Sequence, residues 1–179
     1  CPDLLERIIV VNGVSKAYAM TGWRIGYAAG PKAVIAAMRK IQSQSTSNPT
    51  SISQVAAAAG LSSSQECLEP MIAAFKQRHD RVVARLNEIR GVSCLQSQGA
   101  FYAFPDMREA IASLPGVNND LEMAEYLLNE AGVALVPGSA FGAEGYLRLS
   151  FATSMEILDE ALDRMERVLG RQAGQRAAK

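Results

Sequence analysis

Hydrophobic and polar positions repeat along this chain with two different periods, one typical of strands and one typical of helices. Short apolar runs at residues 8–11 and 25–29 predict buried strands, and Asn12-Gly13 after the first run indicates a turn. Apolar residues three and four apart predict three helices, at residues 31–42, 53–61 and 69–89. Further strands are predicted at residues 92–95, 100–104, 133–136 and 146–151, and further helices at 121–131 and from 153 onward. This mixture of elements predicts an α/β fold.

Two changes in composition suggest how the chain is divided. Residues 43–51 are almost all polar and are typical of a loop, either a linker or part of a binding site. A domain boundary is expected between residues 60 and 70, which gives domains at 1–65 and 66–170. Residues 171–179 have the composition of a solvated tail.

Composition and charge exclude several classes of protein. The 179 residues are 49% hydrophobic and 20% charged, which is typical of a globular domain and not of a disordered chain. Lys plus Arg and Asp plus Glu both number 18, so no basic excess points to nucleic acid. No apolar run is long enough to span a bilayer, and the first residues lack the pattern of a secretory signal. We therefore expect a cytoplasmic protein without a membrane or nucleic-acid partner.

The cysteines and the histidine do not suggest a metal site. The three cysteines, Cys1, Cys67 and Cys94, are widely spaced and form no CxxC pair or Cys/His cluster. His79 has no Ser or Cys partner at a recognisable spacing, so a packed or solvent-edge histidine is expected. No metal ligand set is predicted.

Lys16 is the first candidate for chemistry, because it follows a predicted strand on a turn rich in glycine and serine. Partial desolvation there would lower the pKa of its amine, and a neutral amine can form a Schiff base with an aldehyde. An ordinary loop lysine with its ammonium group in water has the same pattern. The spacing alone favours the ordinary lysine.

The segment SKAYAMTGWRIG at residues 15–26 resembles the pyridoxal-phosphate attachment motif of class I/II aminotransferases of fold type I. GAFY at 99–102, VPGSAFG at 136–142 and LRLS at 147–150 resemble further segments of the same family. The polar stretch around QSQSTSNP at 42–49 is most similar to bacterial aspartate aminotransferases. The resemblance implies the C-terminal part of a fold-type I enzyme, with the end of its large cofactor-binding domain at 1–65 and its small α/β domain at 66–170.

The resemblance also implies roles for individual residues. Lys16 would hold pyridoxal 5'-phosphate as the internal aldimine and then move the proton between the substrate Cα and the cofactor. Ser15 and Arg24 would bind the cofactor phosphate, since a hydroxyl and a guanidinium fork suit phosphate oxygens. A surface cation beside Trp23 is the alternative for Arg24.

Arg148 and Phe101 are the candidates on the substrate side. Alternation within residues 146–151 puts Leu147 and Leu149 on one strand face and Arg148 on the other. An anonymous arginine at such a position usually faces solvent, whereas the resemblance implies a bidentate clamp on the substrate carboxylate. Phe101 would line the substrate side, and a core aromatic is a comparable interpretation.

The family resemblance also shows what these residues lack. Family members are more than twice as long, and their glycine-rich phosphate segment has no counterpart here. Three further residues of the family also have no counterpart here. They are the aromatic residue that stacks on the cofactor ring, the aspartate that pairs with its pyridine nitrogen and the tyrosine that hydrogen-bonds its ring oxygen. We therefore expect a C-terminal fragment that is inactive alone, from an enzyme that is usually a homodimer.

Two classes of function follow. The first is transamination between an amino acid, with aspartate favoured, and 2-oxoglutarate; aromatic or prephenate aminotransferases and lyases of the same fold are alternatives. The second is a catalytically inert fragment or interaction module. The amino-acid preference is open, because the side-chain pocket of the family lies mostly outside the matched region.

Overall fold

The structure is a computed structural model that describes residues 2–176, with side chains described for residues 4–170. The chain divides into two compact units, Cys1–Pro70 and Met71–Lys179. Each unit is described by itself. The domain limits expected at residues 65 and 170 stay a prediction.

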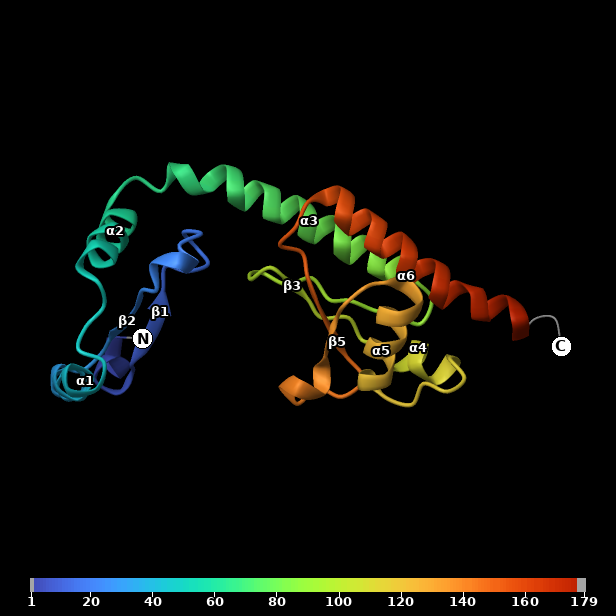
Figure 1. Cartoon of the computed structure of the whole chain (residues 1–179), viewed down its shortest axis with the longest axis horizontal. Coiled ribbons are helices and arrows are strands. Elements are labelled where there is room, and N and C mark those ends of the chain that lie inside the picture. Colours follow the sequence, from blue (N-terminus) through green and yellow to red (C-terminus); the bar gives the residue numbers. More distant parts are fainter. Residues whose placement is uncertain (1, 177–179) are drawn as a thin grey trace. The chain divides into compact units, whose positions relative to one another are not determined.

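The first unit contains a two-stranded antiparallel sheet and two helices (Figure 1). Its elements are η1 (Pro2–Arg7), β1 (Val10–Gly13), η2 (Thr21–Trp23), β2 (Gly26–Ala29), α1 (Lys32–Ser45), α2 (Ser51–Ser62) and η3 (Glu66–Leu68). The small core of the unit consists of Val14, Ile25 and Ala57, with Tyr18 and Met20 packed against it. This core lies where the segment between the strands meets α2.

Asn12 and Gly13 do not form the turn that their sequence suggests. Both belong to β1, where Asn12 pairs with Tyr27 and Gly13 pairs with Gly26. A Cβ atom at Gly13 would lie 3.0 Å from the carbonyl oxygen of Ile25, so the glycine is needed for close approach of the strands. The chain reverses later, through the whole of segment 14–25.

The second unit packs helices against a three-stranded antiparallel sheet with the order β3-β5-β4. Its elements are α3 (Glu69–Glu88, whose first two residues belong to the first unit), β3 (Tyr102–Ala103), α4 (Arg108–Ser113), α5 (Asp120–Ala131), β4 (Val136–Pro137), η4 (Gly138–Phe141), β5 (Leu147–Ser150) and α6 (Met155–Arg176). Its core joins apolar residues of these helices to the buried face of β5, including Leu147 and Leu149. The opposite face of β5 carries Arg148.

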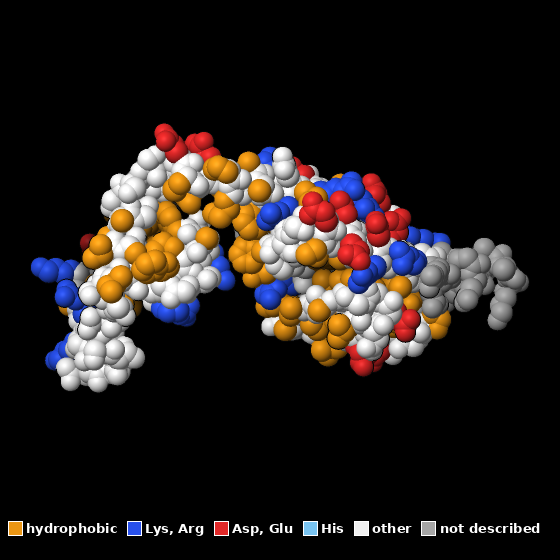
Figure 2. Space-filling model, turned by 45° about the horizontal axis from the view of Figure 1, so that its top comes forward, with side chains coloured by type: hydrophobic (Ala, Val, Ile, Leu, Met, Phe, Trp, Pro, Cys, Tyr) orange, Lys and Arg blue, Asp and Glu red, His pale blue; other side chains and the backbone are white. Residues whose placement is uncertain are grey.

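Helices α3 and α6 run side by side in the second unit (Figure 1). Arg81 Nε lies 2.7 Å from Asp159 Oδ1, and Arg85 Nη2 lies 2.6 Å from Asp163 Oδ1 and 3.1 Å from Glu166 Oε2. Figure 2 shows acidic and basic side chains intermixed over this pair of helices. These hydrogen bonds raise the pKa of Arg85 above its usual range, against the effect of burial. They fix the pairing of the two helices.

Three predicted strands, 92–95, 100–104 and 133–136, are much shorter in the structure. In the first and the last of these, other groups take the backbone hydrogen bonds. The predicted strand 92–95 is reduced to a single bridge between Ser93 and Asp106. Asn87 on α3 accepts from the Cys94 N–H and donates to the Cys94 carbonyl, which satisfies that residue without a strand partner. The predicted strand 133–136 begins only at Val136, because the Val133 N–H donates to Leu127 in the C-terminal cap of α5.

The start of α6 lies close to the predicted residue 153, whereas its end lies later than predicted. Ser154 Oγ accepts from the Ile157 N–H at 3.4 Å, which caps the start of the helix. The helix continues to Arg176, past the predicted start of the tail at residue 171. The prediction that residues 171–179 are solvated concerns side chains that lie outside the described residues.

Candidate functional site

Segment 14–25, which joins β1 to β2, carries three of the predicted site residues. The last strand pair is Gly13 with Gly26, and the Val14 N–H donates to the Ile25 carbonyl at 3.4 Å. Val14 and Ile25 are both buried, and they pack with Ala57 of α2. The base of the segment is therefore closed by hydrogen bonding and anchored by burial.

Ser15 and Lys16 lie on a tight turn at the start of this segment. The Tyr18 N–H donates to the Val14 carbonyl, and the Ala19 N–H donates to the Lys16 carbonyl, both at 3.2 Å. Ala19 adopts the left-handed region with φ 52°, which only a closely constrained turn imposes on a residue with a Cβ. Ser15 is half-buried and Lys16 is exposed. The turn therefore presents the Lys16 side chain at the surface of the described residues.

Tyr18 fixes this turn to the rest of the first unit. Its hydroxyl donates to Gln65 Oε1 at 2.9 Å, and a Cβ atom at Gly60 of α2 would lie 3.5 Å from its ring. Gln65 in turn donates to the Gly60 and Ser63 carbonyls. The turn that carries Lys16 is thus held by a side chain only two residues away.

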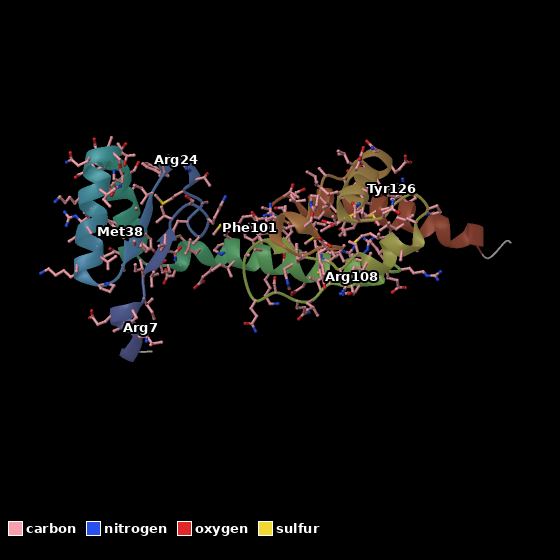
Figure 3. All side chains as sticks on the ribbon, turned by 90° about the horizontal axis from the view of Figure 1, so that it is seen from below. Arg7, Arg24, Met38, Phe101, Arg108 and Tyr126 are labelled. Carbon is pink, nitrogen blue, oxygen red and sulfur yellow. The ribbon has the colours of Figure 1, made fainter. Side chains whose placement is uncertain are left out.

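Arg24 lies at the other end of the segment, where η2 leads into β2 (Figure 3). Its backbone is in the left-handed region, with φ 56° and ψ 45°. Its Nη1 donates to the Thr21 carbonyl at 3.0 Å, and the side chain is exposed. This bond uses one of the five N–H donors of the guanidinium.

The strand register relates Ser15 to Arg24. Gly13 pairs with Gly26 and Val14 bonds to Ile25, so positions 15 and 24 come next on either side of the hairpin. The segment 14–25 contains no carboxylate. A hydroxyl, an amine and a guanidinium on one segment without acids are suited to an anionic ligand such as a phosphate.

Arg148 lies in the second unit on the sheet face opposite the core. Leu147 and Leu149 are buried, whereas Arg148 is half-buried, which confirms the alternation that the sequence predicts. Its Cζ lies 4.5 Å from the ring centroid of Tyr102 and 4.6 Å from that of Phe141. No carboxylate among the described residues forms an ion pair with Arg148. The guanidinium is therefore held by aromatic rings and not neutralised by an acid.

Phe101 lies at the edge of the second core, beside Tyr102. Its ring centroid is 4.4 Å from that of Tyr102 and 6.1 Å from that of Phe75 on α3. The Phe101 carbonyl accepts from the Phe151 N–H at 3.0 Å. The half-buried ring is thus packed as a core aromatic residue is, next to an aromatic ring that contacts Arg148.

Tyr102 and Phe141 are site residues that the sequence analysis did not select. Tyr102 pairs with Ser150, two residues beyond Arg148, so the β3–β5 register brings its ring near the guanidinium. Phe141 reaches Arg148 because η4 folds back before β5 begins. Both rings belong to segments that resemble the family, 99–102 and 136–142. The contact of these rings with Arg148, however, depends on pairing between strands that are distant in the sequence.

The described part of the chain contains no metal-binding cluster. No group of three or more His, Cys, Asp or Glu side chains could hold a metal ion there. His79 is packed, with Nδ1 at 2.9 Å from Asp80, Nε2 accepting from the Ser97 N–H and its ring against Phe151. In the same part of the chain, none of the helices has the length and apolar character needed to cross a bilayer.

Comparison with known proteins identifies the family. The model of the family "Aminotransferase class I and II" matches residues 2–165, which include both Lys16 and Arg148. The chain belongs to the class I and II aminotransferases. This confirms the family that the motif at residues 15–26 resembles.

Two curated relatives of this aminotransferase chain come from bacteria. It is 58% identical to the aspartate/prephenate aminotransferase of Nitrosomonas europaea and 51% identical to the aspartate aminotransferase of Geobacillus stearothermophilus. Both matches cover 94% of this chain, but only 44% and 42% of the relatives. The chain therefore spans less than half the length of these relatives.

A solved structure confirms the predicted fold class. The crystal structure of the aspartate aminotransferase from Rhizobium meliloti matches this aminotransferase chain with a TM-score of 0.91 and 46% sequence identity. The match covers 96% of this chain and 44% of the solved chain. The fold is thus a partial α/β fragment of a fold-type I aminotransferase.

Proposed function

We propose that this chain forms part of a pyridoxal-phosphate-dependent aminotransferase that transfers an amino group between aspartate and 2-oxoglutarate. The observation that carries the proposal is the segment 14–25, which presents Ser15, Lys16 and Arg24 without any carboxylate. The names of its relatives support aspartate as the amino donor. The chain would supply one part of the site, since it spans less than half of those relatives.

The residues of segment 14–25 fit this cofactor chemically. Arg24 and the Ser15 hydroxyl would bind its phosphate, a dianion that matches a guanidinium fork and a hydroxyl donor. Lys16 would hold the cofactor through Nζ and, once released, would accept and return a proton at the substrate Cα. When bound, the cofactor supplies the electron sink for the carbanion that forms at this carbon.

Arg148 would bind the substrate α-carboxylate. A guanidinium with two aromatic contacts and no acid partner in the described residues keeps its charge available for an anionic ligand. Phe101 would line the substrate side through its contact with Tyr102. Amino acid and oxo acid both carry an α-carboxylate, so the same arginine would serve in both half-reactions.

Prephenate is a second candidate for the oxo acid. The relative that is 58% identical is an aspartate/prephenate aminotransferase, which supports this alternative directly. Rates with 2-oxoglutarate and with prephenate, each with aspartate as donor, would distinguish the two.

We also propose a homodimer that is located in the cytoplasm. Ile41, Ile52 and Val55 flank the polar stretch 43–51 and are each about 70% exposed. Exposed apolar side chains of this kind support an interface with further protein, as part of a dimer or of the same polypeptide. Cys67 and Cys94 are free thiols, which supports a reducing compartment.

The experiment is a comparison of two lysine variants in the complete polypeptide that carries this sequence. With pyridoxal phosphate, aspartate and 2-oxoglutarate, Lys16→Arg should lower kcat by more than about a thousandfold, since an arginine keeps the charge but offers no nucleophilic amine. Lys40→Arg on α1 is the matched control and should leave kcat within about twofold. Equal kcat for Lys16→Arg and Lys40→Arg would reject the role of Lys16, whereas no transamination by the unaltered polypeptide would favour an inert interaction module.

A further inference from the structure

Asp120 is the one charged side chain that is buried in the described part of the chain, with 2% of its surface exposed. A buried carboxylate is costly unless it is paired or well hydrogen-bonded. Asp120 is the first residue of α5, but its oxygens accept hydrogen bonds from outside that helix. Oδ2 accepts from the Ser139 N–H at 2.8 Å, and Oδ1 accepts from the Gly145 N–H at 3.3 Å.

These two amides are the two ends of a loop. Loop 139–145 includes most of η4 and leads into β5, the strand that carries Arg148. Burial would raise the pKa of Asp120, but the bonds from Ser139 and Gly145 outweigh it and hold that pKa below its usual value. The carboxylate is therefore ionised in neutral solution and bonds both ends of the loop as an anion.

The loop presents Phe141 to the guanidinium of Arg148. The Phe141 ring centroid lies 4.6 Å from Arg148 Cζ, and the same ring meets Phe104 edge-on at 6.3 Å. Phe104 in turn stacks on Tyr146 at 5.3 Å. Phe141 is half exposed, so apart from these two contacts the position of its ring depends on the backbone that carries it.

We propose that Asp120 is a positioning residue for Arg148. Its carboxylate fixes both ends of loop 139–145, and this holds the Phe141 ring against the guanidinium. The effect on substrate rests on the proposed function, in which Arg148 binds the α-carboxylate. A guanidinium held by two rings has fewer orientations to lose when a carboxylate binds.

An ordinary helix-capping role is the competing explanation, and the chain offers a matched control for it. Asn119 is the N-cap of α5, and its side chain accepts from the Glu122 N–H at 2.9 Å. Asn119→Ala weakens the start of the same helix without touching Ser139 or Gly145. Asp120→Asn keeps the shape of the side chain but removes the charge and one acceptor oxygen.

The test uses the complete polypeptide with its cofactor, labelled with ¹⁵N-arginine and ¹⁵N-serine. The Arg148 Nε–H resonance should carry a ring-current shift from Phe141, which Asp120→Asn reduces and Asn119→Ala preserves. Asp120→Asn should also speed exchange of the Ser139 amide and raise KM for both aspartate and 2-oxoglutarate about tenfold, with kcat within about threefold. Asn119→Ala should change KM by less than about twofold.

A third variant leaves the Asp120 hydrogen bonds intact and changes only the ring that they position. Phe141→Leu removes the ring and should raise KM as Asp120→Asn does, while leaving exchange of the Ser139 amide slow. An unchanged Arg148 resonance in Asp120→Asn would overturn the proposal. Equal KM values in Asp120→Asn and Asn119→Ala would also overturn it, provided that Arg148→Lys raises KM. If Asp120→Asn moves the resonance but neither it nor Arg148→Lys changes KM, the loop contact is supported and the proposed function of Arg148 fails.

Discussion

Arg85 and Arg148 illustrate how the surroundings of one residue decide what it can bind. The Arg85 side chain is 13% exposed and contacts Glu88, Asp159, Asp163 and Glu166 within ion-pair distance. Its charge is used within the protein, to pair α3 with α6. Arg148 contacts Tyr102 and Phe141, which attract a cation without neutralising it.

Arg148→Lys should therefore weaken binding of carboxylate substrates more than it weakens the fold. A lysine replaces a planar fork by a point charge, and the loss of a bidentate pair corresponds to about 1–3 kcal/mol, or a roughly five- to 150-fold rise in KM. The measurement is KM for aspartate and for 2-oxoglutarate in the complete polypeptide. Arg85→Lys is the control: it should lower the unfolding temperature and leave both KM values unchanged. Unaltered KM values in Arg148→Lys would show that the guanidinium is not the clamp.

Asp106 gives a prediction of pH dependence. Arg108 donates to its carboxylate through Nε at 2.9 Å and through Nη2 at 2.5 Å, and this pairing lowers the pKa of Asp106 to about 2. The folded pKa lies below the unfolded value, so the stabilisation is complete above about pH 4 and is lost as the pH falls towards 2. Asp106→Asn should lower the free energy of unfolding by on the order of 1–2 kcal/mol at pH 7 and by much less near pH 2.5.

Urea denaturation of the wild type and Asp106→Asn at both pH values would check this prediction. A difference in unfolding free energy that is the same at the two pH values would contradict it, because an uncharged role of the side chain does not titrate.

The site residues differ in how far the sequence could predict them. Ser15, Lys16 and Arg24 lie within one continuous motif, so a family resemblance is enough to select them. The rings of Tyr102 and Phe141 come together only through β3–β5 pairing and the return of η4, which no local pattern records. The roles of all these residues remain proposals, whereas their places in the fold are observed.

At the scale of elements, η4 depends on a glycine. Gly138 donates to the Tyr146 carbonyl at 2.7 Å and accepts from the Ala143 N–H at 3.0 Å. A Cβ atom at position 138 would lie 2.2 Å from the Ala143 carbonyl oxygen and 2.7 Å from that of Tyr146. These neighbours are backbone atoms, which cannot move aside without displacing the loop.

Gly138→Ala should therefore destabilise the second unit by about 1–3 kcal/mol, the usual cost of forcing extra volume into a packed site. Thermal unfolding is the measurement, with Gly99→Ala as control, since a Cβ atom at Gly99 meets nothing within 4 Å. The same unfolding temperature for the two variants would contradict this account of η4.

The elements themselves were largely predictable, because their periodicity reflects burial. The helix predicted at 69–89 is observed as Glu69–Glu88, and the helix predicted at 121–131 is observed as Asp120–Ala131. Strand ends were less predictable. Asn87 and the C-terminal cap of α5 form hydrogen bonds with backbone groups that the sequence pattern assigned to strands. Whether such a bond replaces strand pairing depends on tertiary contacts, which a local pattern does not contain.

On the scale of the whole molecule, the two units have cores of very different size. Among the described residues the first unit buries Val14, Ile25 and Ala57, whereas the core of the second unit joins all of its helices to its sheet. In the first unit Val11 is 75% exposed, and Figure 2 shows apolar side chains on the surface of this unit. A two-stranded sheet with so little buried surface is marginally stable by itself.

In a chain of these 179 residues, the amides of β1 should exchange with solvent at least about a hundredfold faster than those of β5 and α5. The reason is that opening the first unit exposes little apolar surface that is not exposed already. Hydrogen exchange followed by mass spectrometry resolves the two units. Equal protection of Val11 and Leu149 would contradict this difference in stability.

The central claim is that Lys16 holds the cofactor, and covalent trapping tests it most directly. The complete polypeptide is incubated with pyridoxal phosphate, reduced with borohydride, digested and mapped by mass spectrometry, with Lys16→Arg treated in parallel. The account predicts one phosphopyridoxyl group, on Lys16, and none in the variant. A group on another lysine, or no group in the unaltered polypeptide, would contradict it.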